Sequence, residues 1–115
     1  MEIKIIKEPV ALKELAEIAR NQFGDLVKAV VDIDREIIAI GGELHADEEA
    51  ILLEQGSKQS NLWGINLFPG MKEEWVEFDS FINIRPSQNN RSRDVENLKI
   101  RERIIDILNK LVIHE

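Results

Sequence analysis

The chain has 115 residues, a formal charge of −7, 43% hydrophobic and 32% charged residues, and no cysteine. This composition suits one compact domain over residues 1–115 and excludes disulfides, thiolate zinc sites and cysteine nucleophiles. The acidic charge argues against nucleic-acid or anionic-membrane binding, and no apolar run approaches the roughly 20 residues of a membrane helix. We therefore expect a soluble, cytoplasmic domain.

The N-terminal segment predicts a strand followed by a helix. Residues 2–7 alternate in the manner of a strand, and Pro9 suits the first turn of a helix because its missing N–H costs little there. Apolar residues then recur at three- and four-residue spacing as far as Phe23, and Gly24 can take the left-handed conformation that ends a helix.

From Leu26 the hydrophobic period changes to two, which predicts a hairpin. Its first strand runs to Ile33, Asp34-Arg35 forms the turn, and Glu36 to His45 returns. Residues 47–56 fit either a helix capped by Asp47 or a strand over residues 49–54. We favour the strand, because the apolar residues 51–53 form no helical stripe.

Two further strands and a helix complete the expected fold. Strands are predicted over residues 62–68 and 75–84, and the C-terminal helix begins after Asp94 or Asn97, either of which can cap it. An uninterrupted run of strands between two helices predicts an α+β fold. We expect an antiparallel meander sheet of five to six strands, with the N-terminal and C-terminal helices packed on one face.

Alternation along these strands leaves a second sheet face that mixes aromatic side chains with carboxylates. Such a mixture is unusual for a solvent-facing surface and favours a ligand site or a subunit interface. We expect Phe68, Trp75 and Phe81 to form an interface there, with a homodimer as one outcome. The glycine pair 41–42 can shift the strand register and so change which side chains share this face.

The segment GGELHADEE places Glu43, His45 and Asp47 at every second position. A histidine and two carboxylates on one side of a strand form a ligand set that suits a divalent metal, and they can equally serve acid/base catalysis. Side chains two residues apart on a strand lie roughly 6.5–7 Å apart, so a shared metal requires a bend. The alternative interpretation is that these groups are simply solvated.

The segment IRPSQNNRSRD concentrates three arginines between a strand and a helix in an otherwise acidic chain. Arginine binds phosphate and carboxylate bidentately, which predicts a small anionic ligand. The alternative is that these arginines pair with the protein's own acids. The candidate ligand-binding residues are Arg85, Ser87, Asn89, Asn90, Arg91 and Arg93.

Three segments resemble, in order, a family of small bacterial and archaeal proteins known as a domain of unknown function. They are LVKAVVDIDREIIAIGGELHADEE, SNLWGINLFPG and WVEFDSFINIRPSQNNRSR, which together span roughly residues 26–93. The resemblance implies no activity, no cofactor and no catalytic residue.

Two functions are therefore weighed. The first, which we favour, is a non-enzymatic binding or interaction module that uses the mixed sheet face and the arginine-rich loop. The second is a small metal-dependent or acid/base enzyme centred on Glu43, His45 and Asp47. RNA binding through the loop is a third and weaker hypothesis, because the net charge repels phosphate.

Overall fold

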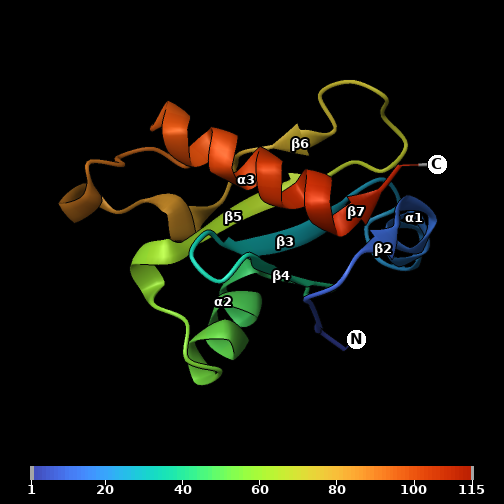
Figure 1. Cartoon of the computed structure of the whole chain (residues 1–115), viewed down its shortest axis with the longest axis horizontal. Helices are drawn as coiled ribbons and strands as arrows, with labels where there is room; N and C mark the ends of the chain where they lie inside the picture. The colour runs from blue at the N-terminus through green and yellow to red at the C-terminus, as the bar shows by residue number, and fades with distance from the viewer. Residues whose placement is uncertain (1, 115) are drawn as a thin grey trace.

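The computed structural model describes residues 2–114, which form three α-helices and seven short strands (Figure 1). In chain order the elements are β1 (Lys4–Ile6), β2 (Val10–Ala11), α1 (Leu12–Asn21), β3 (Val27–Asp32), β4 (Ile37–Ile40), α2 (His45–Glu54), β5 (Leu62–Leu67), β6 (Val76–Glu77), α3 (Leu98–Leu111) and β7 (Val112–Ile113). Three 3₁₀ turns, η1 (Gln59–Asn61), η2 (Phe81–Asn83) and η3 (Pro86–Gln88), lie in the connections.

Five strands form one sheet in the order β1-β4-β3-β5-β6, and every neighbouring pair is antiparallel. The predicted α+β class with an antiparallel sheet is confirmed. The strand order departs from a meander at two connections. Strand β1 pairs with β4 instead of β3, and the chain crosses β3 through α2 on its way from β4 to β5. Strands β2 and β7 form a separate parallel pair near the two ends of the chain.

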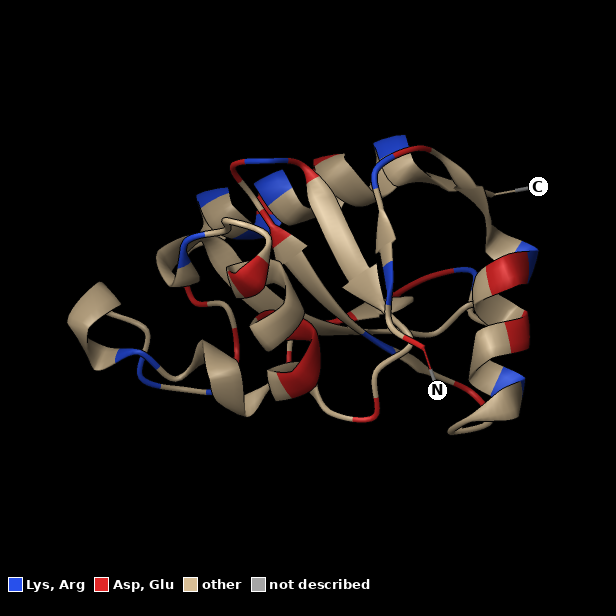
Figure 2. Cartoon of the chain, turned by 90° about the horizontal axis from the view of Figure 1, so that it is seen from below, with Lys and Arg blue, Asp and Glu red and all other residues tan. Residues whose placement is uncertain are grey.

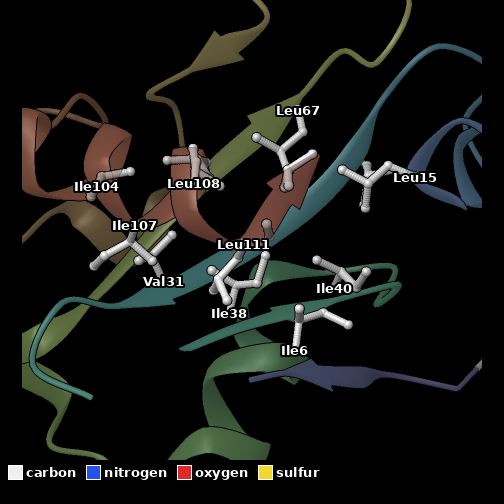
Figure 3. Packing of buried hydrophobic residues seen from close by; sticks show 14 of the residues in the cluster. Ile6, Leu15, Val31, Ile38, Ile40, Leu67, Ile104, Ile107, Leu108 and Leu111 are labelled. Atoms are coloured by element: carbon white, nitrogen blue, oxygen red, sulfur yellow. The ribbon is translucent and has the colours of Figure 1, made fainter. Parts of the chain in front are cut away.

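Helices α1 and α3 pack on the same face of the sheet, as predicted. Their buried side chains meet alternate residues of β1, β3, β4 and β5, which form the larger hydrophobic core (Figure 3). Leu15 of α1 and Leu108 of α3 are 0% and 1% exposed. Burying a side chain of this size stabilises the fold by about 1.5–3 kcal/mol, so this face supplies most of the stability.

Helix α2 covers part of the opposite face, and the prediction of a strand over residues 49–54 is wrong. Its Leu52 packs in a smaller cluster with Val30, Ala39 and Leu62. The segment EEAILLE consists mostly of good helix formers, and α2 docks on the sheet through three buried side chains, His45, Glu48 and Leu52. The absence of an apolar stripe reflects this shallow docking, because most of the helix faces solvent.

The returning strand of the hairpin also ends earlier than predicted, at Ile40 instead of His45. Gly41 adopts φ +90°, and a side-chain Cβ there would lie 2.9 Å from the Glu2 carbonyl oxygen. A left-handed glycine breaks the extended run, so the chain turns out of the sheet and starts α2.

The predicted strand over residues 75–84 is only two residues long, because β6 ends at Glu77. Ser80 then accepts a hydrogen bond from the Ile82 N–H and starts η2. The side-chain amide of Asn83 makes the two hydrogen bonds to Gly64 that a neighbouring strand would otherwise make. It accepts from the Gly64 N–H at 2.8 Å and donates to the Gly64 carbonyl at 2.9 Å. Of the two predicted caps of α3, Asn97 is the one that accepts from backbone N–H groups of the first turn.

Candidate functional site

The two segments that the sequence singles out meet at one cleft, which we call the His45 cleft. It lies on the face of the sheet that carries α2 and has a volume of about 280 Å³. It is lined by residues of β3, of the N-terminal end of α2, of β5 and of the segment between β6 and α3: Lys28, Leu44, His45, Ala46, Asn66, Asp79, Ser80, Phe81, Ile82 and Arg93.

His45 is the first residue of α2 and is 9% exposed. Its Nε2 lies 2.8 Å from the carbonyl oxygen of Ile65 on β5. A carbonyl only accepts hydrogen bonds, so Nε2 carries the proton and Nδ1 keeps its lone pair. Burial lowers the pKa of His45, although the contact with Ile65 opposes this shift. The imidazole is therefore neutral at pH 7, with one nitrogen able to accept a proton or a hydrogen bond.

Arg93 reaches the cleft because its backbone is held against the end of the sheet. Its carbonyl accepts hydrogen bonds from the Ser80 N–H and the Asn83 side chain, each at 3.0 Å. Its guanidinium pairs with Asp79 at 2.6 Å and lies over the Phe81 ring, 4.3 Å from the centroid. Both contacts orient the arginine at the rim of the cleft, where its other guanidinium N–H groups, which have no hydrogen-bond partner among residues 2–114, can donate to a ligand.

Lys28 and the first turn of α2 add positive potential to the same cleft. The N-cap residue of α2, Leu44, has no side chain that can cap the helix. The backbone N–H groups of residues 45 and 46 lie at the start of the helix, where the positive end of the helix dipole favours an anion. Figure 2, viewed from the side on which α2 lies, shows basic bands along the segment that leads to α3. Within the lining, two cations face a single carboxylate, Asp79.

Asn66 supplies a buried polar group to the cleft. It is 8% exposed, and its Nδ2 donates to the Glu77 carboxylate at 2.8 Å and to the Asp79 carbonyl at 3.4 Å. Its Oδ1 is buried and has no hydrogen-bond partner among residues 2–114. An unpaired buried acceptor costs free energy, which a donor on a ligand or a bound water would recover.

Glu48, which the sequence analysis did not single out, is buried directly beside this site. It is 0% exposed, and its Oε2 accepts a hydrogen bond from the Gly42 N–H at 2.9 Å. Burial raises the pKa of Glu48 to about 9, so the carboxyl is protonated at pH 7. In a capping box, a glutamate in the first turn of a helix accepts from a backbone N–H just before that helix, and the contact of Glu48 with the Gly42 N–H is similar. The signal available in the sequence was therefore a glutamate that follows the glycine pair 41–42 by six residues.

The structure does not bring together the predicted metal ligands Glu43, His45 and Asp47. Glu43 and Asp47 are exposed, whereas His45 is buried against β5. The prediction assumed strand alternation, but α2 begins at His45, so these side chains follow a helical and not a two-residue period. Within residues 2–114, no group of three His, Asp or Glu side chains is placed to hold a metal ion.

Of the six residues predicted to bind an anion, Arg93 is the one that lines the cleft. Arg85 folds inward, donates to the carbonyls of Gln59 and Leu62, and lies over the Trp63 ring, 4.2 Å from the centroid. Asn90 is 3% exposed and ties the loop together through its side-chain amide.

The other three loop residues are exposed and lie away from the cleft. Ser87 belongs to η3, Asn89 ends it in the left-handed conformation at φ 60°, and Arg91 donates its backbone N–H to Glu96. The loop is therefore held together mainly by its own hydrogen bonds, and its C-terminal end places Arg93 at the cleft.

The three residues predicted to form one interface lie in different places. Trp75 packs against the larger core and meets His114 edge-on, with ring centroids 4.7 Å apart. Phe68 lines a groove beside α1, and Phe81 lies at the His45 cleft, 72% exposed. They were grouped by strand alternation, which fails here because β6 stops at Glu77.

Comparison with models of known protein families matches residues 4–111 to DUF5674, described as a protein of unknown function. The resemblance noted over residues 26–93 is thus confirmed and extends further at both ends. No curated protein and no solved structure matches the chain. Across residues 2–114, no helix has the length and apolar character required to cross a membrane.

Proposed function

The chain belongs to the DUF5674 family of proteins of unknown function, and we propose that it is a binding module that takes a small organic acid into the His45 cleft. The single observation that carries the proposal is the convergence of His45 and Arg93 on one cleft. These residues come from two segments 48 positions apart in the sequence.

The charges of the cleft favour a carboxylate as the ligand's polar end. Lys28 and Arg93 outnumber Asp79 in the lining, although the whole chain carries a charge of −7. The start of α2 adds the positive end of its dipole. A carboxylate accepts bidentate hydrogen bonds from a guanidinium, and neutral His45 sits beside it without adding charge.

Apolar side chains at the mouth of the cleft favour an organic body attached to that carboxylate. Leu44 and Phe81 are 56% and 72% exposed, and Ile82 lies between the cleft and the smaller core. Large exposed apolar groups around a polar centre are typical of ligand sites. The ligand would cover them and recover their burial free energy.

Benzoate is a suitable probe because it joins a carboxylate to a small apolar ring. We expect saturable changes in amide NMR shifts at residues 44–46, at Asn66 and at residues 80–82. Lys28→Gln should weaken the binding by about fivefold, the size of a partly exposed ion pair. Benzyl alcohol, which lacks the charge, should bind more weakly than benzoate.

Arg93→Gln and Arg91→Gln form a matched pair, because both remove one charge from the same loop. Only Arg93 lines the cleft, so Arg93→Gln should weaken benzoate binding while Arg91→Gln leaves it unchanged. Equal effects of the two substitutions, or shifts that never saturate, would contradict the proposal. Thermal unfolding of each variant checks that the loss of the Asp79 pair has not unfolded the loop.

A second candidate function, proton transfer by His45, is favoured by its fixed tautomer. The Ile65 carbonyl holds the proton on Nε2, so Nδ1 is the basic atom of a neutral imidazole. A panel of p-nitrophenyl esters offers a direct assay. Release of p-nitrophenol by the wild-type protein and not by His45→Gln would support this function. Equal release by the two proteins would contradict it.

A further inference from the structure

A second cleft, which shares no lining residue with the His45 cleft, lies between the end of β1, the β3–β4 turn and the last turns of α3. We call it the Lys7 cleft. It has a volume of about 470 Å³ and is lined by the cationic side chains of Lys7, Arg35 and Lys110, together with Glu36. The buried side chains of Ile37, Ile107 and Leu111 form its apolar floor.

The positive charge of this cleft exceeds what its own carboxylates neutralise. Glu36 accepts from Lys110 at 2.5 Å and from Arg103 at 3.1 Å, and these two bonds lower the pKa of Glu36, so it is ionised at pH 7. One carboxylate therefore faces two cations at this point. Lys7 is exposed and forms no ion pair among residues 2–114, so its charge adds to the excess.

The charge of Arg35 does not add to this excess of positive charge, because a buried acid, Asp32, is linked to it through Ser57. Its guanidinium donates to Ser57 Oγ at 2.9 Å and to the Gln55 carbonyl at 3.2 Å. The Ser57 hydroxyl in turn donates to Asp32, which is 0% exposed and also accepts from the backbone of the turn. Asp32 thus offsets Arg35, and Lys7 and Lys110 still outnumber Glu36 in the lining, with Arg103 next to it as the second partner of Glu36.

We propose that the Lys7 cleft binds the phosphate group of a small phosphorylated molecule. When Arg103, the second partner of Glu36, is counted with the lining residues Lys7 and Lys110, the positive charges exceed Glu36 by two, and this excess matches a dianion better than a monoanion. The apolar floor receives the organic part that carries the phosphate. A bound dianion would offset the mutual repulsion of Lys7, Arg103 and Lys110, which Glu36 neutralises only in part.

Phenyl phosphate and inorganic phosphate, titrated at constant ionic strength, test the proposal by amide NMR. We expect saturable shifts at residues 34–37 and 107–111, with phenyl phosphate saturating at the lower concentration because its ring covers the floor. Benzoate should shift these residues less than phenyl phosphate does. Because the two clefts report through different amides, failure of one proposal is distinguishable from failure of the other.

Paired lysine substitutions supply the control. The double variant Lys7→Gln/Lys110→Gln should weaken phenyl phosphate binding by more than about tenfold, whereas Lys13→Gln/Lys99→Gln, with the same change in net charge outside the cleft, should leave it unchanged. Lys7→Gln alone, which breaks no ion pair of the fold, should weaken it by about two- to fivefold. Equal losses in the two double variants, or shifts proportional to concentration, would overturn the proposal.

Discussion

The carboxyl of Glu48 lies against the backbone of Gly42, whose N–H donates to Glu48 Oε2 at 2.9 Å. A Cβ at position 42 would lie 2.8 Å from Glu48 Cγ, so the glycine leaves the space that the glutamate fills. The contact joins the end of β4 to the first turn of α2. It therefore fixes the helix start that places His45 against β5.

Gly42→Ala should destabilise the protein by about 1–3 kcal/mol, because the new methyl group overlaps a buried side chain. Urea denaturation measures this change. The loss should be smaller when Glu48 is first shortened to alanine, since Glu48→Ala opens the space that the methyl group requires. Simple additivity of the two substitutions would show that the clash is not with Glu48.

Glu48→Gln should stabilise the protein at neutral pH. The pKa of Glu48 rises from 4.5 in the unfolded chain to about 9 in the fold. Above pH 4.5 the unfolded state loses the proton that the fold retains, so stability falls as pH rises toward 9. By pH 7 this loss amounts to about 3 kcal/mol, which the neutral amide avoids.

Urea denaturation of the wild type and of Glu48→Gln at pH 4, 6 and 8 tests this slope. The advantage of the variant should grow with pH and nearly vanish at pH 4. Glu54→Gln, an exposed position on the same helix, is the control and should show no such trend. Parallel curves for Glu48→Gln and the wild type would mean that Glu48 is ionised in the fold.

His45 should titrate with a midpoint below 6.5, because burial disfavours its charged form. The unfolded chain binds a proton as pH falls through 6.5 while the folded imidazole does not, so stability is lost below that pH. The ring signals in NMR spectra measure the midpoint, and His45→Gln assigns them. At pH 7.5 the ¹⁵N shifts should show protonated Nε2 and unprotonated Nδ1. The opposite tautomer would contradict the contact with Ile65.

The sequence predicted the elements whose stability comes from regular burial. Helices α1 and α3 have strong apolar faces, and β3, β4 and β5 have alternating or continuous apolar runs, so their periodicity identified them. A helix over residues 47–56 was the alternative that we did not favour, because α2 docks through few side chains and shows no apolar stripe. Its conformation is decided by tertiary contacts, namely Leu52 in the smaller core and Glu48 against Gly42.

The candidate site was located in part, through the two segments that line it, but its geometry was wrong. Strand alternation put Glu43, His45 and Asp47 together, and a single left-handed glycine, Gly41, removes the basis for that grouping. Lys28 was not predicted as a site residue, because one lysine on a strand gives no local signal. Its place at the cleft follows from the pairing of β3 with β5, which only the tertiary structure establishes.

Asn83→Ala should cost about 2–4 kcal/mol and should also weaken benzoate binding, although Asn83 does not line the His45 cleft. The substitution leaves the buried N–H and carbonyl of Gly64 without their side-chain partner. It also removes the bond to the Arg93 carbonyl that holds this arginine at the rim.

Hydrogen exchange at the Gly64 amide and urea denaturation measure the first effect, and the benzoate titration measures the second. Ser87→Ala, at an exposed position of the same loop, is the control and should change neither. A stable Asn83→Ala protein with slow Gly64 exchange would show that a neighbouring group or a water replaces the amide. Unchanged benzoate affinity in that variant would show that the Asp79 pair and the Phe81 ring alone position Arg93.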